Sequence, residues 1–293
     1  MTALSRRDLV LLALLTIAWG VNWPVMKFGV TSFPPLLFRV IVLAGGVAVL
    51  WLWIRARRIP LAVPPGKRFT VLRLAVPNVI IWQILSVLAL KLLPSGRAAI
   101  LGYTMPVWAV VVSVLFFGDR PLPRHWLGIA AALVGTLLLL ATELATFAGS
   151  PLGTVLMLIA AATWGWGTVL LRRQMLDLPT VTLGFWMLAA AVPVAAVTTL
   201  AFEAAQWRGP TPAEWGAILY NILVAIAFCH IVWFHIARLL PPAASGLSVM
   251  LIPVVGIFSS MAMLGEQPHW QDYTALALIL MALATVLLPQ RTG

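Results

Sequence analysis

The chain has 293 residues, of which 62% are hydrophobic and 9% are charged, and its formal net charge is +11. Soluble globular domains carry an apolar fraction nearer one half and about a quarter of charged residues, so this composition excludes them and indicates a membrane protein. The single cysteine, Cys229, lies in an apolar stretch, which leaves neither a disulfide nor a cysteine-based zinc site. We expect no metal and no other cofactor.

Ten apolar stretches are long enough to cross a hydrocarbon core of about 30 Å as helices. None shows the short alternation typical of a transmembrane β-strand, so the predicted fold class is an all-α polytopic membrane protein. Arg6 and Arg7 precede a long apolar stretch without a small-residue cleavage site, which predicts a retained first span rather than a signal peptide. The predicted spans are Leu9–Phe28, Pro35–Ile54, Val71–Leu92, Ala98–Phe117, Trp126–Thr142, Leu152–Leu171, Val181–Phe202, Trp215–Ala237, Ala244–Leu264 and Tyr273–Leu288.

The second half of the chain repeats the first. Residues 239–268 repeat residues 92–121 at one offset of 147, and upstream residues repeat at an offset of 145. Each unit holds an odd number of predicted spans, so the second unit must lie upside down in the bilayer, as in many transporters. The predicted units are residues 1–145 and 146–293. The matching motifs are Leu92-Leu93-Pro94 with Leu239-Leu240-Pro241, Pro106 with Pro253, Gly118-Asp119 with Gly265-Glu266, and Trp19-Gly20 with Trp164-Gly165.

The basic residues are distributed unevenly over the predicted loops. With the N-terminus inside, fourteen Lys and Arg residues fall on the cytoplasmic side and four on the outer side, while Arg39 lies within a span. This excess predicts that both termini are cytoplasmic. It also explains the positive charge as a topology signal, so we expect no nucleic-acid partner. Contact of the basic 55–73 connection with anionic lipid headgroups is the alternative role of these charges.

Polar side chains near the middle of the predicted spans mark a candidate substrate site, because such groups usually face the interior of a bundle. The offset of 147 pairs Gln83 in the third span with His230 in the eighth. By helical spacing Trp82, Gln83 and Ser86 share a face, as do Cys229, His230 and Trp233. Asn78 precedes Trp82 by one turn. These residues are predicted to line a cavity, and the alternative is that they hydrogen-bond neighbouring helices.

Further residues extend this candidate site. Trp164 lies deep in the sixth span, and Asn22 and Tyr103 add hydrogen-bonding capacity. A buried indole offers a flat apolar face and one donor, which suits an organic ligand better than an inorganic ion. Packing in the core is the alternative role for each aromatic residue. The predicted substrate-binding residues are Asn22, Asn78, Trp82, Gln83, Tyr103, Trp164, His230 and Trp233.

Four other residues are interpreted as architectural. Pro106 and Pro253 lie inside the fourth and ninth spans, where the missing amide bond can open a kink, so both are predicted hinges. Lys27 ends the first span, where a cation interacts favourably with the carbonyl end of a helix. Arg39 is expected to snorkel outward from the second span, with contact to a substrate carboxylate as the alternative.

The repeat motifs resemble those of the EamA family. They are the segment from Gly96 to Leu140 with Pro106 and Phe116-Phe117-Gly118-Asp119, the segment from Gly246 to Leu288 with Pro253 and Met263-Leu264-Gly265-Glu266, the two Trp-Gly pairs, and Phe38-Arg39. Over almost its whole length the chain is similar to ten-helix members of the drug/metabolite transporter superfamily. This resemblance implies two inverted five-helix repeats around a central cavity, in an exporter of metabolites, often amino acids, from the bacterial cytoplasm. The deep aromatic residues are similar to those of the aromatic amino acid exporters.

These observations predict a multi-pass inner-membrane exporter of amino acids, aromatic or otherwise apolar, that works by alternating access. A monomer is sufficient, because both repeats lie in one chain. None of the eight acidic residues lies at the middle of a span, so obligatory proton coupling is not expected, and His230 is the histidine at depth. The alternatives are a carrier of another metabolite or drug, of a nucleotide sugar or of a lipid-linked substrate, and a non-transporting receptor. Hydrolase, zinc-protease and Walker motifs are absent, so no enzyme is predicted.

Overall fold

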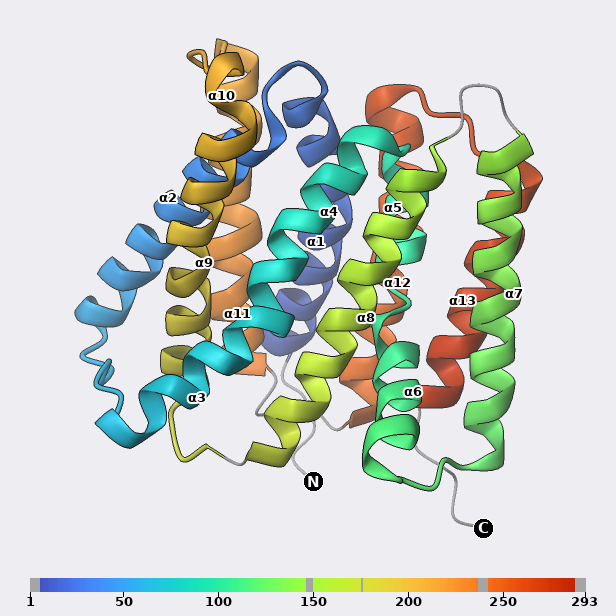
Figure 1. The fold of residues 1–293 in the computed structure, drawn as a ribbon, viewed down its shortest axis with the longest axis horizontal. Helices are drawn as coiled ribbons and strands as arrows, with labels where there is room; N and C mark the ends of the chain where they lie inside the picture. Colours follow the sequence, from blue (N-terminus) through green and yellow to red (C-terminus); the bar gives the residue numbers. More distant parts are fainter. Residues whose placement is uncertain (1–5, 146–149, 175, 237–241, 288–293) are drawn as a thin grey trace.

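The computed structural model describes residues 6–145, 150–174, 176–236 and 242–287, and within these ranges every regular element is helical (Figure 1). In chain order the elements are α1 (Arg6–Ser32), α2 (Pro35–Ala56), α3 (Pro65–Ala75), η1 (Val76–Ile80), α4 (Ile81–Leu92), α5 (Ser95–Gly102), α6 (Met105–Phe117), α7 (Pro123–Ala145), α8 (Pro151–Gln174), α9 (Thr180–Glu203), η2 (Ala204–Gln206), α10 (Pro212–Tyr220), η3 (Asn221–Phe228), α11 (Cys229–Ile236), α12 (Pro242–Leu264) and α13 (Trp270–Leu287).

These elements form ten helical passes in the described residues, because the third, fourth, seventh and eighth passes are each built from more than one element. Eight passes are long and apolar enough to cross a membrane, and α12 contributes the shorter apolar helix Met250–Leu264. The predicted all-α membrane fold is therefore confirmed. The predicted span ends Ala237 and Leu288, and the motif at residues 239–241, lie outside the described residues.

The passes of one repeat pack against passes of the other, and each such pair has a counterpart in which the two repeats have exchanged roles. Helix α1 packs against α12, and its counterpart α8 packs against α6. Helix α4 of the third pass packs against α8, and its counterparts α10 and α11 of the eighth pass pack against α1. Helix α2 packs against its own counterpart α9, and α7 packs against its own counterpart α13. The start of α1 and the end of α13 lie at one end of the bundle (Figure 1), here called the Arg6 end. The opposite end, where α4 ends, is called the Lys91 end.

The duplicated Trp-Gly pairs lie at corresponding helix crossings. A methyl group on Gly20 of α1 would lie 2.4 Å from Val255 Cγ1 of α12. A methyl group on the repeat mate Gly165 of α8 would lie 2.7 Å from the Met105 carbonyl oxygen and 2.8 Å from the Ala109 amide nitrogen of α6. Each glycine therefore allows the first helix of one repeat to cross the fourth pass of the other at short range.

Both repeats contain a widened π-helical turn in their third pass, η1 in the first and η3 in the second. An asparagine at each turn donates to the carbonyl four residues earlier: Asn78 Nδ2 to Leu74 O and Asn221 Nδ2 to Ala217 O, both at 3.0 Å. Such turns shift the backbone hydrogen-bond register and occur frequently at functional sites. They lie directly before the segments that carry Trp82 and His230.

The two predicted hinge prolines lie in different surroundings. The fourth pass is interrupted at Tyr103 and Thr104, and Pro106 lies in the first turn of the new helix α6, where its missing N–H leaves no bond unmade. Thr104 Oγ1 donates to Leu101 O at 2.7 Å across this interruption. Its mate Pro253 lies inside α12, which continues on both sides of it. The break in the fourth pass is thus not reproduced at Pro253 in the ninth.

Candidate functional site

The repeat mates Trp19 and Trp164 each make an aromatic contact with the third pass of the other repeat. The rings of Trp164 on α8 and Trp82 on α4 have centroids 5.3 Å apart at an interplanar angle of 67°. The ring of Trp19 on α1 lies 6.2 Å from that of His230 and 5.9 Å from that of Trp233, both on α11. The structure thus places four of the predicted site residues in two groups related by the duplication.

Trp23 connects these two groups. It follows Trp19 by one turn of α1, and its ring lies 6.5 Å from that of Tyr103. A methyl group on Gly102 would lie 3.1 Å from Trp23 Cη2 and 3.2 Å from Trp82 Cη2, so both indoles cover the same glycine. We call the connected set the aromatic belt. It comprises Trp19, Trp23, Trp82, Tyr103, Trp164, His230 and Trp233.

Trp23 is missing from the predicted substrate-binding residues. Its spacing of four from Trp19 could have identified it, because residues four apart share a helical face. Trp23 is buried, whereas Trp82, Tyr103 and Trp164 are half-buried.

Some polar groups of the aromatic belt are hydrogen-bonded to the backbone, and others are without a partner among the described residues. Trp19 Nε1 donates to Ala225 O at 3.2 Å, and His230 Nδ1 lies 2.7 Å from Ile226 O. Both carbonyls belong to η3, where the widened turn changes which carbonyls are occupied within the helix. In the described part of the chain the indole N–H groups of Trp82 and Trp164 make no hydrogen bond to protein. These two donors are available to a ligand.

The predicted amide residues have three different environments. Asn22 Oδ1 is buried on α1 and has no hydrogen-bond partner. Asn78 is buried against α8, where a methyl group on Gly167 would lie 2.5 Å from its Nδ2 atom. Gln83 is 9% exposed on α4 and forms no hydrogen bond within the described residues. Gln83 and His230 lie on passes that both pack against α1, and their lining of one cavity stays a prediction.

The predicted outward snorkelling of Arg39 is wrong. Arg39 is 4% exposed, because its guanidinium turns toward α1 and Nη2 donates to Met26 Sδ at 3.0 Å. Its Nε atom is buried and has no hydrogen-bond partner. A cation therefore lies in the interior of the bundle.

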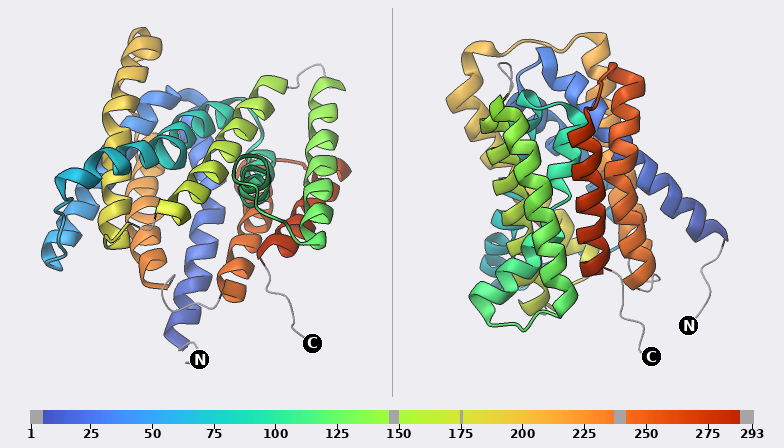
Figure 2. Two further views of the ribbon diagram at one scale, coloured as in Figure 1. Left: turned by 60° about the horizontal axis from the view of Figure 1, so that its bottom comes forward. Right: turned by 90° about the vertical axis from the view of Figure 1, so that its right-hand side faces the viewer.

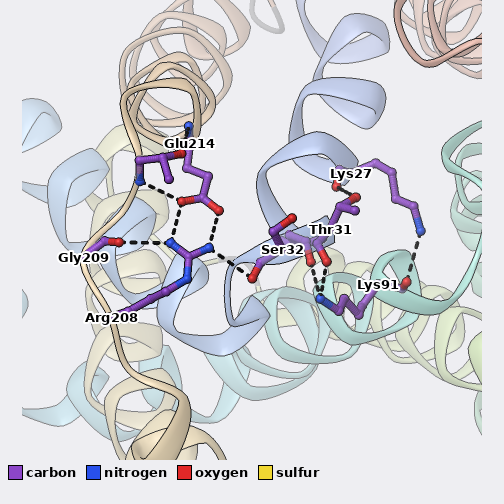
Figure 3. Close-up of polar contacts among 9 residues, drawn as sticks. Lys27, Thr31, Ser32, Lys91, Arg208, Gly209 and Glu214 are labelled. Carbon is purple, nitrogen blue, oxygen red and sulfur yellow. Dashed lines mark hydrogen bonds and ion pairs between the residues drawn. The ribbon is translucent and has the colours of Figure 1, made fainter.

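The Lys91 end is closed by two lysines that cap each other's helices (Figure 3). Lys27 Nζ of α1 donates to Leu90 O and Lys91 O at the end of α4, both at 3.0 Å. Lys91 Nζ of α4 donates to Val30 O and Thr31 O at the end of α1, at 2.7 and 2.6 Å. We call this arrangement the lysine clasp. A cation does interact with a carbonyl end as predicted, but Lys27 caps the neighbouring helix rather than its own.

Acidic residues cap helix N-termini at the same end. Glu266 accepts from the Ser95 and Gly96 amides of α5 at 2.7 and 3.1 Å. Glu203 accepts from the Leu36 and Leu37 amides of α2 at 3.1 and 2.9 Å. Because the N-terminus of a helix carries partial positive charge, each carboxylate stabilises the helix that it caps.

Two ion pairs and a small pocket complete this end. Arg97 pairs with Asp272 at 2.8 Å, with both side chains less than a tenth exposed. Arg208 pairs with Glu214 and also donates to Ser32 O at 3.1 Å (Figure 3). Beside the second pair lies a pocket of about 350 Å³, lined by Phe28, Thr31, Ser32, Arg208, Thr211, Glu214 and Leu264.

The Arg6 end is held more weakly. Asp119, the mate of Glu266, pairs with Arg173 at 2.6 Å, and the two side chains are 49% and 41% exposed. Hydrogen bonding from Arg173 holds the pKa of the Asp119 carboxyl below its usual range. Arg172, the mate of Lys27, is exposed and forms neither a hydrogen bond nor an ion pair with the described residues. The first turns of α1 project from the bundle here (Figure 2). The two ends, which the duplication relates, are therefore in different states.

The ten helical passes of the described residues, eight of them long and apolar enough to cross a membrane, pair in a way that is preserved when the two halves are exchanged. Together with the aromatic belt between the halves, they define a multi-pass membrane transporter. The model of the EamA-like transporter family matches residues 7–141 and again residues 151–288, and the chain belongs to this family. The predicted membership is thereby confirmed, and the predicted boundary between the units falls between the two matched ranges.

Several relatives match along most of their length. The chain is 29% identical to the uncharacterized inner membrane transporter YedA of Escherichia coli (strain K12), over 94% of this chain and 88% of that one. It is 26% identical to the uncharacterized transporter YoaV of Bacillus subtilis (strain 168), over 86% and 87%. A probable amino-acid metabolite efflux pump of Salmonella typhimurium is 24% identical, over 90% and 89%. One crystal structure at 23% identity shares the fold, with a TM-score of 0.66 over 96% of this chain and 99% of the other.

Proposed function

We propose that the protein exports amino acids with aromatic or other apolar side chains from the cytoplasm, across a bacterial inner membrane, by alternating access. The observation that carries this proposal is the aromatic belt, which joins both repeats and keeps the indole N–H groups of Trp82 and Trp164 free. A site between repeats changes its access when one repeat moves against the other. A relative named as a probable amino-acid metabolite efflux pump supports the choice of substrate class.

The orientation that we propose places the Arg6 end in the cytoplasm. Fourteen basic residues are assigned to that side and four to the other, which is the bias expected for cytoplasmic loops. In this orientation the lysine clasp lies on the outer side, where we propose that it seals the belt from outside. One chain contains both halves of the site, so a monomer suffices for transport.

Removal of the paired indoles tests the site. We expect Trp82→Ala and Trp164→Ala to slow efflux of labelled L-phenylalanine from proteoliposomes by about two- to tenfold, because an aromatic pair contributes about 0.5–1.5 kcal/mol. Efflux of L-alanine should change much less, because it has no ring to stack. The control is Trp126→Ala, which removes an indole that is 55% exposed on α7.

Three outcomes of this experiment separate the possibilities. No amino acid efflux by the wild type would contradict the proposed function, leaving another metabolite, a drug, a nucleotide sugar or a lipid-linked molecule as the substrate. Equal losses for phenylalanine and alanine would leave transport intact but contradict an aromatic-lined site. Loss of efflux in Trp126→Ala as well would point to a general effect of removing a tryptophan.

We further propose that efflux follows the substrate gradient without obligatory proton exchange. Proton relays are usually built from acidic or histidine side chains that lie within the membrane and face the bundle interior or a water-filled cavity. Here the buried acids at the Lys91 end, Glu203, Glu214 and Asp272, are engaged by backbone amides or by arginine. We expect no net accumulation when a pH gradient is imposed with equal substrate on both sides. Sustained uphill accumulation that a protonophore abolishes would overturn this expectation and direct attention to His230.

A further inference from the structure

Arg39 is a buried cation with no carboxylate beside it. The ion pairs of the described residues join Arg97 to Asp272, Arg173 to Asp119 and Arg208 to Glu214, and none includes Arg39. Its Nη2 atom meets only the sulfur of Met26, which is a weak acceptor, and its Nε atom has no partner. Buried charges in proteins are normally paired, so this guanidinium is incomplete without an anion.

Asn22 carries a buried hydrogen-bond acceptor that has no donor, its Oδ1 atom. Asn22 and Met26 are four residues apart on α1, so they lie on one face and about 6 Å apart along the helix axis. Trp19 and Trp23 of the aromatic belt share this face by the same spacing. The contact between Met26 and Arg39 therefore brings a free donor, a free acceptor and two indoles to one side of α1.

We propose that Arg39 binds the carboxylate and Asn22 Oδ1 the ammonium group of an α-amino acid whose side chain lies against the aromatic belt. A guanidinium donates two parallel hydrogen bonds to a carboxylate through Nε and one Nη atom, in a geometry that a lysine cannot provide. The carboxylate replaces the thioether of Met26 as the acceptor. This assignment rests on the proposed function, and it explains how a site without a fixed anion selects a zwitterion: an amide oxygen serves the ammonium, and a buried guanidinium serves the carboxylate.

The first test uses the wild-type protein and three ligands of one shape. Affinities of the purified transporter in detergent are measured by calorimetry for L-phenylalanine, for phenethylamine, which lacks the carboxylate, and for 3-phenylpropanoate, which lacks the ammonium group. Because a hydrogen bond to a charged group contributes about 1.5–3 kcal/mol, each analogue should bind about tenfold or more weakly. Equal affinity for L-phenylalanine and phenethylamine would overturn the role of Arg39. Tighter binding of phenyl phosphate than of L-phenylalanine would replace the carboxylate by a phosphate ester.

The second test assigns each group to its residue. Arg39→Gln should bind L-phenylalanine and phenethylamine equally, whereas Asn22→Leu should lose its preference for L-phenylalanine over 3-phenylpropanoate and keep the other preference. The matched control is Arg124→Gln at the start of α7, because Arg124 also has a buried Nε atom without a partner but lies outside the belt. If Arg39→Gln retains full discrimination, the assignment is wrong.

The result of this test is separable from that of the transport proposal. A wild-type protein that neither binds nor exports amino acids contradicts the proposed function. A wild-type protein that exports L-phenylalanine but does not distinguish the analogues contradicts the role of Arg39 and Asn22 alone. Should Arg39→Gln fail to fold, the wild-type ligand series still decides the matter, and Arg39→Lys, which keeps the charge but not the paired donors, should bind L-phenylalanine more weakly.

Discussion

Gly165→Ala is expected to lower the stability of the folded protein by about 1–3 kcal/mol, the usual cost of forcing a methyl group into a packed interior. The new methyl group would lie 2.7 Å from Met105 O and 2.8 Å from Ala109 N. Both are backbone atoms of α6, so the clash is relieved only by moving one helix against the other. The measurement is the fraction of protein that stays monodisperse in detergent after heating to a series of temperatures.

Substitutions at two other glycines provide comparisons for this prediction. Gly20→Ala should be comparably destabilising, because its methyl group would lie 2.4 Å from Val255 Cγ1 and 2.5 Å from Val255 Cβ, and a Cβ atom does not move when the side chain changes rotamer. Gly216→Ala in α10 should be neutral or slightly stabilising, because a methyl group there meets nothing within 4 Å and alanine favours a helix over glycine. Equal melting of all three variants would contradict the close crossing of α8 and α6.

The spans and the duplication could be predicted from the sequence because both depend on local information. Hydropathy over about twenty residues identifies a span, and an offset between motifs identifies a repeat. The same motif also identified Trp19 and Trp164 as equivalent, and the structure gives each an aromatic contact with the third pass of the other repeat. The role of the adjacent glycines could not be predicted, because no pattern in the sequence indicates which spans are neighbours. The structure shows that they allow close helix crossings, with α12 for Gly20 and with α6 for Gly165.

The remaining differences have the same cause. The rule that a cation favours a carbonyl end is correct for Lys27, but α1 and α4 end side by side, so the nearest free carbonyls belong to the other helix. The rule that an arginine near a span end snorkels fails for Arg39 because Met26 of α1 covers it. The spacing of Trp23 from Trp19 places both on one helical face, but its contacts with Tyr103 and Gly102, which lie on another pass, follow only from the structure. Each case depends on which helices are adjacent, and a single sequence does not contain that information.

The largest functional effect is expected from removing the lysine clasp. In Lys27→Met combined with Lys91→Met, four carbonyls at the ends of α1 and α4 lose their ammonium donors, while the apolar stems are kept. Each lost hydrogen bond to a charged group removes about 1.5–3 kcal/mol from the closed state. Because the substrate-binding belt is proposed to be sealed from outside by this clasp, the double variant should shift the population toward an outward-open state.

Accessibility of a buried position from the outer side measures this shift. Ser86 lies one turn beyond Trp82 on α4 and is 2% exposed, so Ser86→Cys, in a chain whose Cys229 is replaced by alanine, reports opening of the site. Labelling by an impermeant maleimide added outside should rise about tenfold or more in the lysine double variant. The matched control is Arg172→Met, which removes the exposed mate of Lys27 and should leave labelling unchanged. The clasp has no gating role if the double variant labels no faster than this control, and the Lys91 end would face the cytoplasm if labelling rises only when the reagent is admitted there.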